Sequence, residues 1–144
     1  MVIRVHTHAT EEESRVLYCL RNILPSSVEV VKANTKGHHG NPISVFEARI
    51  DQRKVLKGVW QCIFSRLPSA ELNRLIQTTP EKVDDNCFFY LRFDKPAANN
   101  GSLVLTDIGD AVRLMFKILS FPAKREVAVP LVEKFLEEHR IHEA

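Results

Sequence analysis

The segment Cys87–Asp94, with the sequence CFFYLRFD, has the strongest β-strand pattern in the chain. A strand places alternate side chains on opposite faces. Phe89 and Leu91 therefore share one face, while Tyr90 and Arg92 share the other. The apolar face has to be covered by other elements, and the polar face is free to stay open. This segment therefore predicts a sheet with one covered and one open face.

Periodicity and stop signals predict the other elements. Thr10 and Glu13 form a capping box that begins the first helix, and Pro130 predicts a kink or break near Val127 in the last helix. The expected strands are 2–8, 28–34, 43–50, 87–94, 103–105 and 112–121. The expected helices are 10–24, 52–67, 69–76 and 123–138, with one further turn at 79–80.

This order of elements, β-α-β-β-α-α-β-β-β-α, predicts an α+β fold. We expect a single, mainly antiparallel sheet with the helices on one face, and a single domain that spans residues 1–144. The residues expected on the covered face are Ile3, Val5, Phe46, Ala48, Phe89, Leu91, Phe93, Val112, Leu114, Phe116 and Ile118.

The opposite face is expected to be cationic and partly aromatic. Its predicted members are Arg4, His6, His8, Arg49, Tyr90, Arg92, Arg113 and Lys117, with Glu47 as an acidic exception and Phe88, Met115 and Leu119 as apolar ones. Guanidinium groups and rings stack on bases, and cations follow phosphates, so such a face suits RNA. A solvated face with scattered charges and a homodimer interface are the alternatives that the pattern leaves open.

Composition narrows the class of protein without naming a partner. The 144 residues include 20 basic and 18 acidic ones, so the net charge of +2 gives no global attraction to nucleic acid. The three cysteines form no C-x-x-C pair, which excludes a zinc ribbon. The sequence contains no membrane-length apolar run and no secretory signal pattern, so we expect a cytoplasmic protein without membrane association.

The segment KGHHGN, residues 36–41, predicts a hairpin loop between two strands, with Gly37 and Gly40 free to take positive φ. A zinc site needs three or four converging ligands. The adjacent His38 and His39 point in different directions from a turn, so we expect them to share no metal. The sequence predicts no other cofactor.

Acid–base catalysis on RNA is an open alternative, because histidine titrates near neutral pH. His6, His8, His38 and His39 are the candidates. No spacing among them places two rings beside one phosphate, so the sequence favours a protein that is not an enzyme.

Four segments in order resemble an archaeal RNA-binding family that is often labelled predicted exosome subunit. They are HATEEESRVLYCLRNILP, KGHHGNPI, FYLRFDKPAA and FPAKRE, and the resemblance extends over nearly the whole chain. Pro96 and Pro130 depart from the family pattern. The resemblance implies a fold similar to the ribosomal protein that contacts 5S ribosomal RNA, and it implies non-catalytic RNA binding linked to RNA processing or exosome-mediated degradation.

Residues of these segments and of the cationic face form the predicted RNA site. They are Lys36, His38, His39, Asn41, Arg92, Lys95, Arg113, Lys117, Lys124 and Arg125. We expect KGHHGN, Arg92–Lys95 and Lys124–Arg125 to form one contiguous basic surface. The expected partners are single-stranded or structured RNA and exosome or ribosomal components. A protein-docking module on an RNA-processing or ribosomal assembly is the second hypothesis, and a histidine-dependent ribonuclease is the third.

Overall fold

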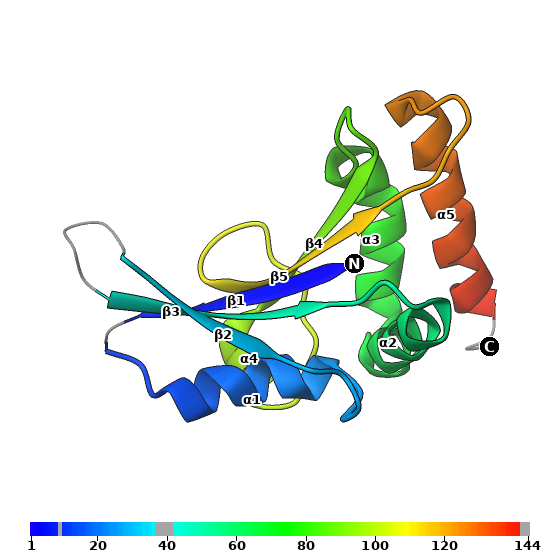
Figure 1. Cartoon of the computed structure of the whole chain (residues 1–144). Helices are drawn as coiled ribbons and strands as arrows, with labels where there is room; N and C mark the ends of the chain where they lie inside the picture. Colours follow the sequence, from blue (N-terminus) through cyan, green and yellow to red (C-terminus); the bar gives the residue numbers. More distant parts are fainter. Residues whose placement is uncertain (9, 37–41, 142–144) are drawn as a thin grey trace.

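The computed structural model describes residues 1–8, 10–36 and 42–141, and Figure 1 shows its elements. Five strands form one antiparallel sheet in the order β2-β3-β1-β5-β4. The strands are β1 (Val2–Thr7), β2 (Val31–Lys36), β3 (Pro42–Arg49), β4 (Phe88–Asp94) and β5 (Ala111–Lys117). The helices are α1 (Glu13–Ile23), α2 (Arg53–Arg66), α3 (Ser69–Lys82), α4 (Lys95–Asn99) and α5 (Arg125–Ile141).

The helices cover one face of this sheet, as the alternation in the strands predicted. In Figure 1, α1 and α4 lie beneath the sheet, and α2, α3 and α5 gather at its other end. The predicted covered-face residues from Ile3 to Leu114 are all buried, and Phe116 and Ile118 pack partly buried against the same core. The α+β single-sheet prediction is therefore confirmed.

Aromatic packing joins α2 and α5 to the sheet. The ring of Trp60 in α2 stacks on Phe64 at a centroid distance of 5.6 Å and meets the edges of Phe116 and Phe135 at 5.6 and 5.3 Å. Such edge-to-face contacts stabilise a core beyond the area that they bury. This cluster holds α2 and α5 beside the end of β5.

Two predicted helix features are wrong at the helix ends. Helix α1 begins at Glu13, with Glu12 as its N-cap and no side-chain cap, so the predicted capping box is wrong. The Glu13 carboxylate instead accepts from Lys32 and Ser44, both at 2.8 Å. Helix α3 continues to Lys82 through Pro80, where a separate turn was expected. The Pro80 nitrogen has no hydrogen and donates no backbone hydrogen bond in this helix.

Other element boundaries also differ from the predictions. Residues 103–105 form only one bridge, between Leu105 and Phe93, and not a strand. Strand β2 begins at Val31, and β5 ends at Lys117, each shorter than predicted. Helix α5 runs without a break through Pro130. No helix among the described residues is both long and apolar enough to cross a bilayer.

Candidate nucleic-acid interface

Three arginines form one row across the open face of the sheet. Arg4 of β1 lies opposite Arg113 of β5, which lies opposite Arg92 of β4. Like charges directly opposite each other on one face of a sheet destabilise the fold. The row is therefore a local concentration of positive charge that the fold itself does not require.

Among the described residues, a carboxylate forms an ion pair with this row at one end, and Asp107 acts on Arg92 only through its charge. The Glu47 carboxylate accepts from Arg4 Nε at 2.7 Å and from Arg49 Nε at 2.6 Å. Arg92 donates to the carbonyl of Gly109 at 2.6 Å, and its buried Nε has no partner. Arg113 is exposed and forms no hydrogen bond or ion pair with the part of the chain that the structure describes. Two guanidinium groups are thus available to anions.

A hollow of about 380 Å³ lies in this face beside the row. Apolar and aromatic groups line it together with the three guanidinium groups, and the lining residues are Val2, Arg4, Tyr90, Leu91, Arg92, Arg113, Leu114 and Met115. A base needs a flat apolar or aromatic surface, and its phosphate needs a cation nearby. The hollow offers both within one surface.

The open face continues along β4 and β5 towards Phe88. The rings of Phe88 and Tyr90 lie 6.3 Å apart, and the Lys117 ammonium lies 4.7 Å from the Phe88 ring centre. The Tyr90 hydroxyl donates to Asp84 at 3.1 Å. Hydrogen bonds, first from the Phe88 amide and then from Tyr90, lower the pKa of Asp84. The face therefore carries an aromatic pair, half-buried Phe88 and exposed Tyr90, with one cation beside it.

His6 lies on the same face, next to the arginine row. Burial first, and then the charges of Arg113 and Arg4, hold the pKa of His6 below its usual value. The ring is therefore neutral at pH 7, and it can stack or accept without adding charge. Leu119, which was expected on this face, instead lies beyond the end of β5 and lines a groove with residues of α2 and α5.

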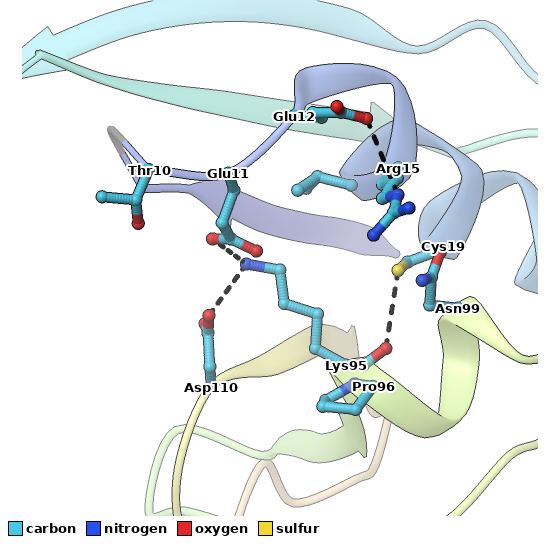
Figure 2. Close-up of a pocket in the computed structure, with 10 residues that line it drawn as sticks. Thr10, Glu11, Glu12, Arg15, Cys19, Lys95, Pro96, Asn99 and Asp110 are labelled. Carbon is cyan, nitrogen blue, oxygen red and sulfur yellow. Dashed lines mark hydrogen bonds and ion pairs between the residues drawn. The ribbon is translucent and has the colours of Figure 1, made fainter.

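Lys95 was expected on the basic RNA-binding surface with Arg92, but it does not lie on the open face. It is only 4 % exposed. Its ammonium group donates to the His6 carbonyl at 2.6 Å and to Glu11 Oε1 and Asp110 Oδ2, both at 2.8 Å. Figure 2 shows the ammonium between the two carboxylates, in a pocket of about 510 Å³ next to α1. Lys95 is an internal cation that ties β1, α1 and α4 to the loop before β5.

His8 extends this cluster to the surface, where its Nε2 lies 3.1 Å from Asp110 Oδ2. Burial by itself raises the pKa of Asp110, but the hydrogen bonds and charges of Lys95 and His8 outweigh burial and lower that pKa. His8, Glu11 and Asp110 place ligand atoms within 4.8 Å of one another, a spacing that fits a metal ion. The Lys95 ammonium already bonds both carboxylates, so the position for a cation is taken.

Lys124 and Arg125 lie away from Arg92–Lys95, so the expectation of one contiguous surface is wrong. Asp94 pairs with the first residue of β5, whereas Lys124 and Arg125 follow the last. Six residue steps along β4, about 20 Å, separate the two ends. Arg125 is exposed, but its Nε donates to the Val83 carbonyl at 2.9 Å, which ties its guanidinium group to the segment between α3 and β4. Lys124 is exposed.

Of the predicted hairpin, only the two paired strands are confirmed. Antiparallel pairing of β2 with β3 extends to Lys36 and Pro42. The residues between them, Gly37 to Asn41, lie outside the described residues, and with them the predicted contacts of His38, His39 and Asn41. Sequence patterns placed Arg4, Arg92 and Arg113 on one face. Glu11 and Asp110, which neutralise Lys95, carry no signal in the sequence, because 99 positions separate them.

The chain is an α+β protein whose open sheet face combines a row of arginines with a hollow lined by aromatic and apolar groups. A family model described as RNA binding matches residues 1–118, and the chain belongs to that family. RNA-binding protein PAB1135 of Pyrococcus abyssi is 32% identical over 140 residues, which cover 94% of this chain and 91% of that protein.

Solved structures share the fold. Mth689, a DUF54 protein from Methanothermobacter thermautotrophicus, is 32% identical with a TM-score of 0.75, and the match covers 94% of this chain and 95% of that one. Protein AF2318 of Archaeoglobus fulgidus is 24% identical with a TM-score of 0.82, and the match covers 92% of this chain and 96% of that one. The second likeness concerns the fold alone.

Proposed function

We propose that this protein binds RNA through the open face of its sheet. The observation that carries the proposal is the row Arg4–Arg113–Arg92, in which Arg113 and Arg92 form no ion pair among the described residues, beside a hollow that contains Tyr90 and Met115. The fold gains nothing from placing these like charges together, whereas a chain of phosphates does. Membership in the RNA-binding family supports the same assignment.

Unpaired nucleotides fit this surface better than a closed duplex. The hollow is shallow and lies in an open sheet, so that a splayed base can stack on Tyr90 while its phosphate meets Arg113. A duplex hides its base faces and offers only phosphates and 2′-hydroxyls to such a surface. We therefore infer a preference for single-stranded segments or loops.

The remaining predicted contacts extend the proposed site. Lys117, at the far end of β5, faces the same side as Phe88. Lys36 ends β2, His38, His39 and Asn41 follow it in the sequence before β3, and Lys124 is an exposed cation beyond β5. Lys95 and Arg125 are left out of the proposed contacts, because their side chains hold the fold together.

Fluorescence anisotropy with a labelled single-stranded RNA tests this proposal. Arg92→Ala and Arg113→Ala should each weaken binding, and the double variant should weaken it further. Lys134→Ala is the matched control, because Lys134 is an exposed cation on α5, which belongs to the helical layer. Equal affinities for the double variant and the native protein, with both folded, would exclude the open face as the RNA site.

We further propose that the protein acts without catalysis in RNA processing, in contact with exosome or ribosomal components. This link, and the likeness to the 5S-RNA-binding ribosomal protein, follow from the sequence resemblance. One observation favours a second candidate, a ribonuclease: the His8 ring lies 3.1 Å from the Asp110 carboxylate, next to the open face. Incubation of labelled RNA with the protein separates the two. Products that disappear in His8→Ala would favour the ribonuclease.

A further inference from the structure

An apolar groove of about 630 Å³ lies between α2 and α5 at the end of β5, away from the arginine row. Trp60 of α2, Phe116 of β5 and Phe135 of α5 form its aromatic lining, and Leu119 and Leu131 lie at its edge. Figure 1 places α2, α5 and the segment that joins β5 to α5 at the same end of the molecule. Nothing in the described part of the chain fills this groove.

Among the described residues, the two most exposed large apolar side chains lie next to this groove. Phe121 is 95 % exposed and Leu119 is 82 % exposed, and both belong to the short connection between β5 and α5. Leu131 on the groove wall is 46 % exposed. Scattered single apolar residues are ordinary on a surface, but a cluster beside an apolar groove marks an interaction site.

We propose that a second copy of this chain occupies the groove, with Phe121 of each copy inserted into the groove of the other. The projection and the groove lie side by side on the same end of one molecule. A two-fold axis that passes between them therefore brings each projection over the opposite groove. Such a contact is closed and self-complementary, and it buries both features of both chains at once.

Charges at the groove rim support a copy of this chain as the occupant. Arg53 and Lys57 line the α2 side, and the first turn of α2 contains no acidic residue. On α5, Glu138 follows Phe135 by three residues and Leu131 by seven, so it projects from the same helix face. Within the described residues, none of these three charged side chains has an ion-pair partner. A second copy therefore carries an acidic side chain for the basic rim of the first copy and basic side chains for its acidic rim.

RNA fits this groove less well than the open face. Its lining is mainly aliphatic and aromatic, and Arg53 and Lys57 are the only arginine and lysine among the described lining residues. The open face carries three arginines in one row. In the proposed dimer, the two open faces stay exposed, so that each copy remains able to bind RNA.

Sedimentation velocity and light scattering on the purified full chain test the proposal. The native protein should reach twice the 16.5 kDa mass of one chain as its concentration rises. Phe121→Ser removes the projection, and Leu131→Arg places a charge in the groove wall. Each change should weaken self-association at least about tenfold, because buried aromatic anchors at the centre of an interface dominate its affinity. Both residues are exposed, so the variants should keep native circular dichroism spectra and unfolding midpoints.

Mixing the two variants provides the decisive measurement. Neither variant can form the contact with itself, but the intact Phe121 of the Leu131→Arg variant can enter the intact groove of the Phe121→Ser variant. An equimolar mixture should therefore recover a dimer with one of the two contacts. Ile108→Ser is the matched control, because Ile108 is 81 % exposed but lies in the loop before β5, at the other end of that strand.

Four outcomes would overturn the proposal. The native protein stays at 16.5 kDa at its highest soluble concentration; Ile108→Ser lowers the mass as much as Phe121→Ser; or the mixture of variants stays monomeric. In the fourth, groove variants leave the mass unchanged and weaken RNA binding, which would make the groove an RNA surface. The RNA affinity of the Arg92 and Arg113 variants is measured separately, so the test of the dimer does not depend on the RNA proposal.

Discussion

Arg113 lies directly opposite Arg92 in the β4–β5 ladder, and no carboxylate pairs with either side chain among the described residues. Arg4 lies opposite Arg113 on its other side. The sheet thus holds three guanidinium groups in one row and neutralises only the outermost, through Glu47. A surface of this kind has a higher free energy without a ligand than with a polyanion.

The first prediction follows from that repulsion. Arg113→Ala should raise the free energy of unfolding by about 0.5 kcal/mol, because it removes a like-charge pair across two strands. The same change should weaken RNA binding several-fold. Urea unfolding and fluorescence anisotropy of the same sample measure both effects. A variant that loses stability and keeps its RNA affinity would mean that Arg113 serves the fold.

The second prediction concerns salt. Each phosphate contact that is lost should flatten the plot of log K against log salt concentration by about one unit. The double variant of Arg92 and Arg113 should therefore show a slope smaller by about two units than the native protein. Titrations at several salt concentrations give the slopes, and Lys134→Ala should keep the native slope.

The third prediction concerns His6, whose pKa burial and then Arg113 and Arg4 hold below its usual value. Folding favours neutral His6, so this residue contributes stability above the unfolded pKa of about 6.5, and the contribution is lost as the pH falls towards the lower folded pKa. Arg113→Ala should raise the pKa of His6, and bound RNA should raise it further. Proton NMR titration of the His6 ring measures both shifts.

His6→Gln is the control for this prediction. It should remove the part of the acid-induced loss of stability that begins near pH 6.5. If Arg113→Ala leaves the pKa of His6 unchanged, the two side chains are not neighbours on the open face, and the register of β1 with β5 needs revision.

The fourth prediction concerns Lys95. Lys95→Met removes the buried ammonium between Glu11 and Asp110 and should lower the free energy of unfolding by about 3 kcal/mol at pH 7, because two carboxylates then face each other without a cation. In the native protein, the lowered pKa of Asp110 makes stability fall as the pH falls below about 4. In Lys95→Met, stability should instead rise on mild acidification. Chemical unfolding at several pH values measures this reversal.

The alternation in the sequence predicted which way most strand residues point. Phe89 and Leu91 are buried while Tyr90 and Arg92 lie on the other face, as the two-residue repeat of a strand requires. Leu119 shows where that counting ends, because the strand stops at Lys117 and the chain then turns towards α5. Local patterns determine orientation within an element, but they determine its end less well.

The buried position of the Lys95 side chain was decided by the tertiary structure. In the sequence it follows Asp94 at the end of a predicted strand and has the character of a surface cation. In the fold, its ammonium bonds the carbonyl of His6, which is 89 positions away, and Glu11, which is 84 positions away. No local repeat encodes a contact of that span, so only the packing of α1 and α4 against β1 makes Lys95 an internal cation.

The sequence alone determined an open, cationic sheet face opposite an apolar one, because side-chain direction in a strand depends only on position along the chain. The order β2-β3-β1-β5-β4 was decided by tertiary structure, and with it the row that joins Arg4, Arg113 and Arg92. Strand neighbours are chosen by the fit of whole faces against the shared core, and that fit exists only once the helices have packed.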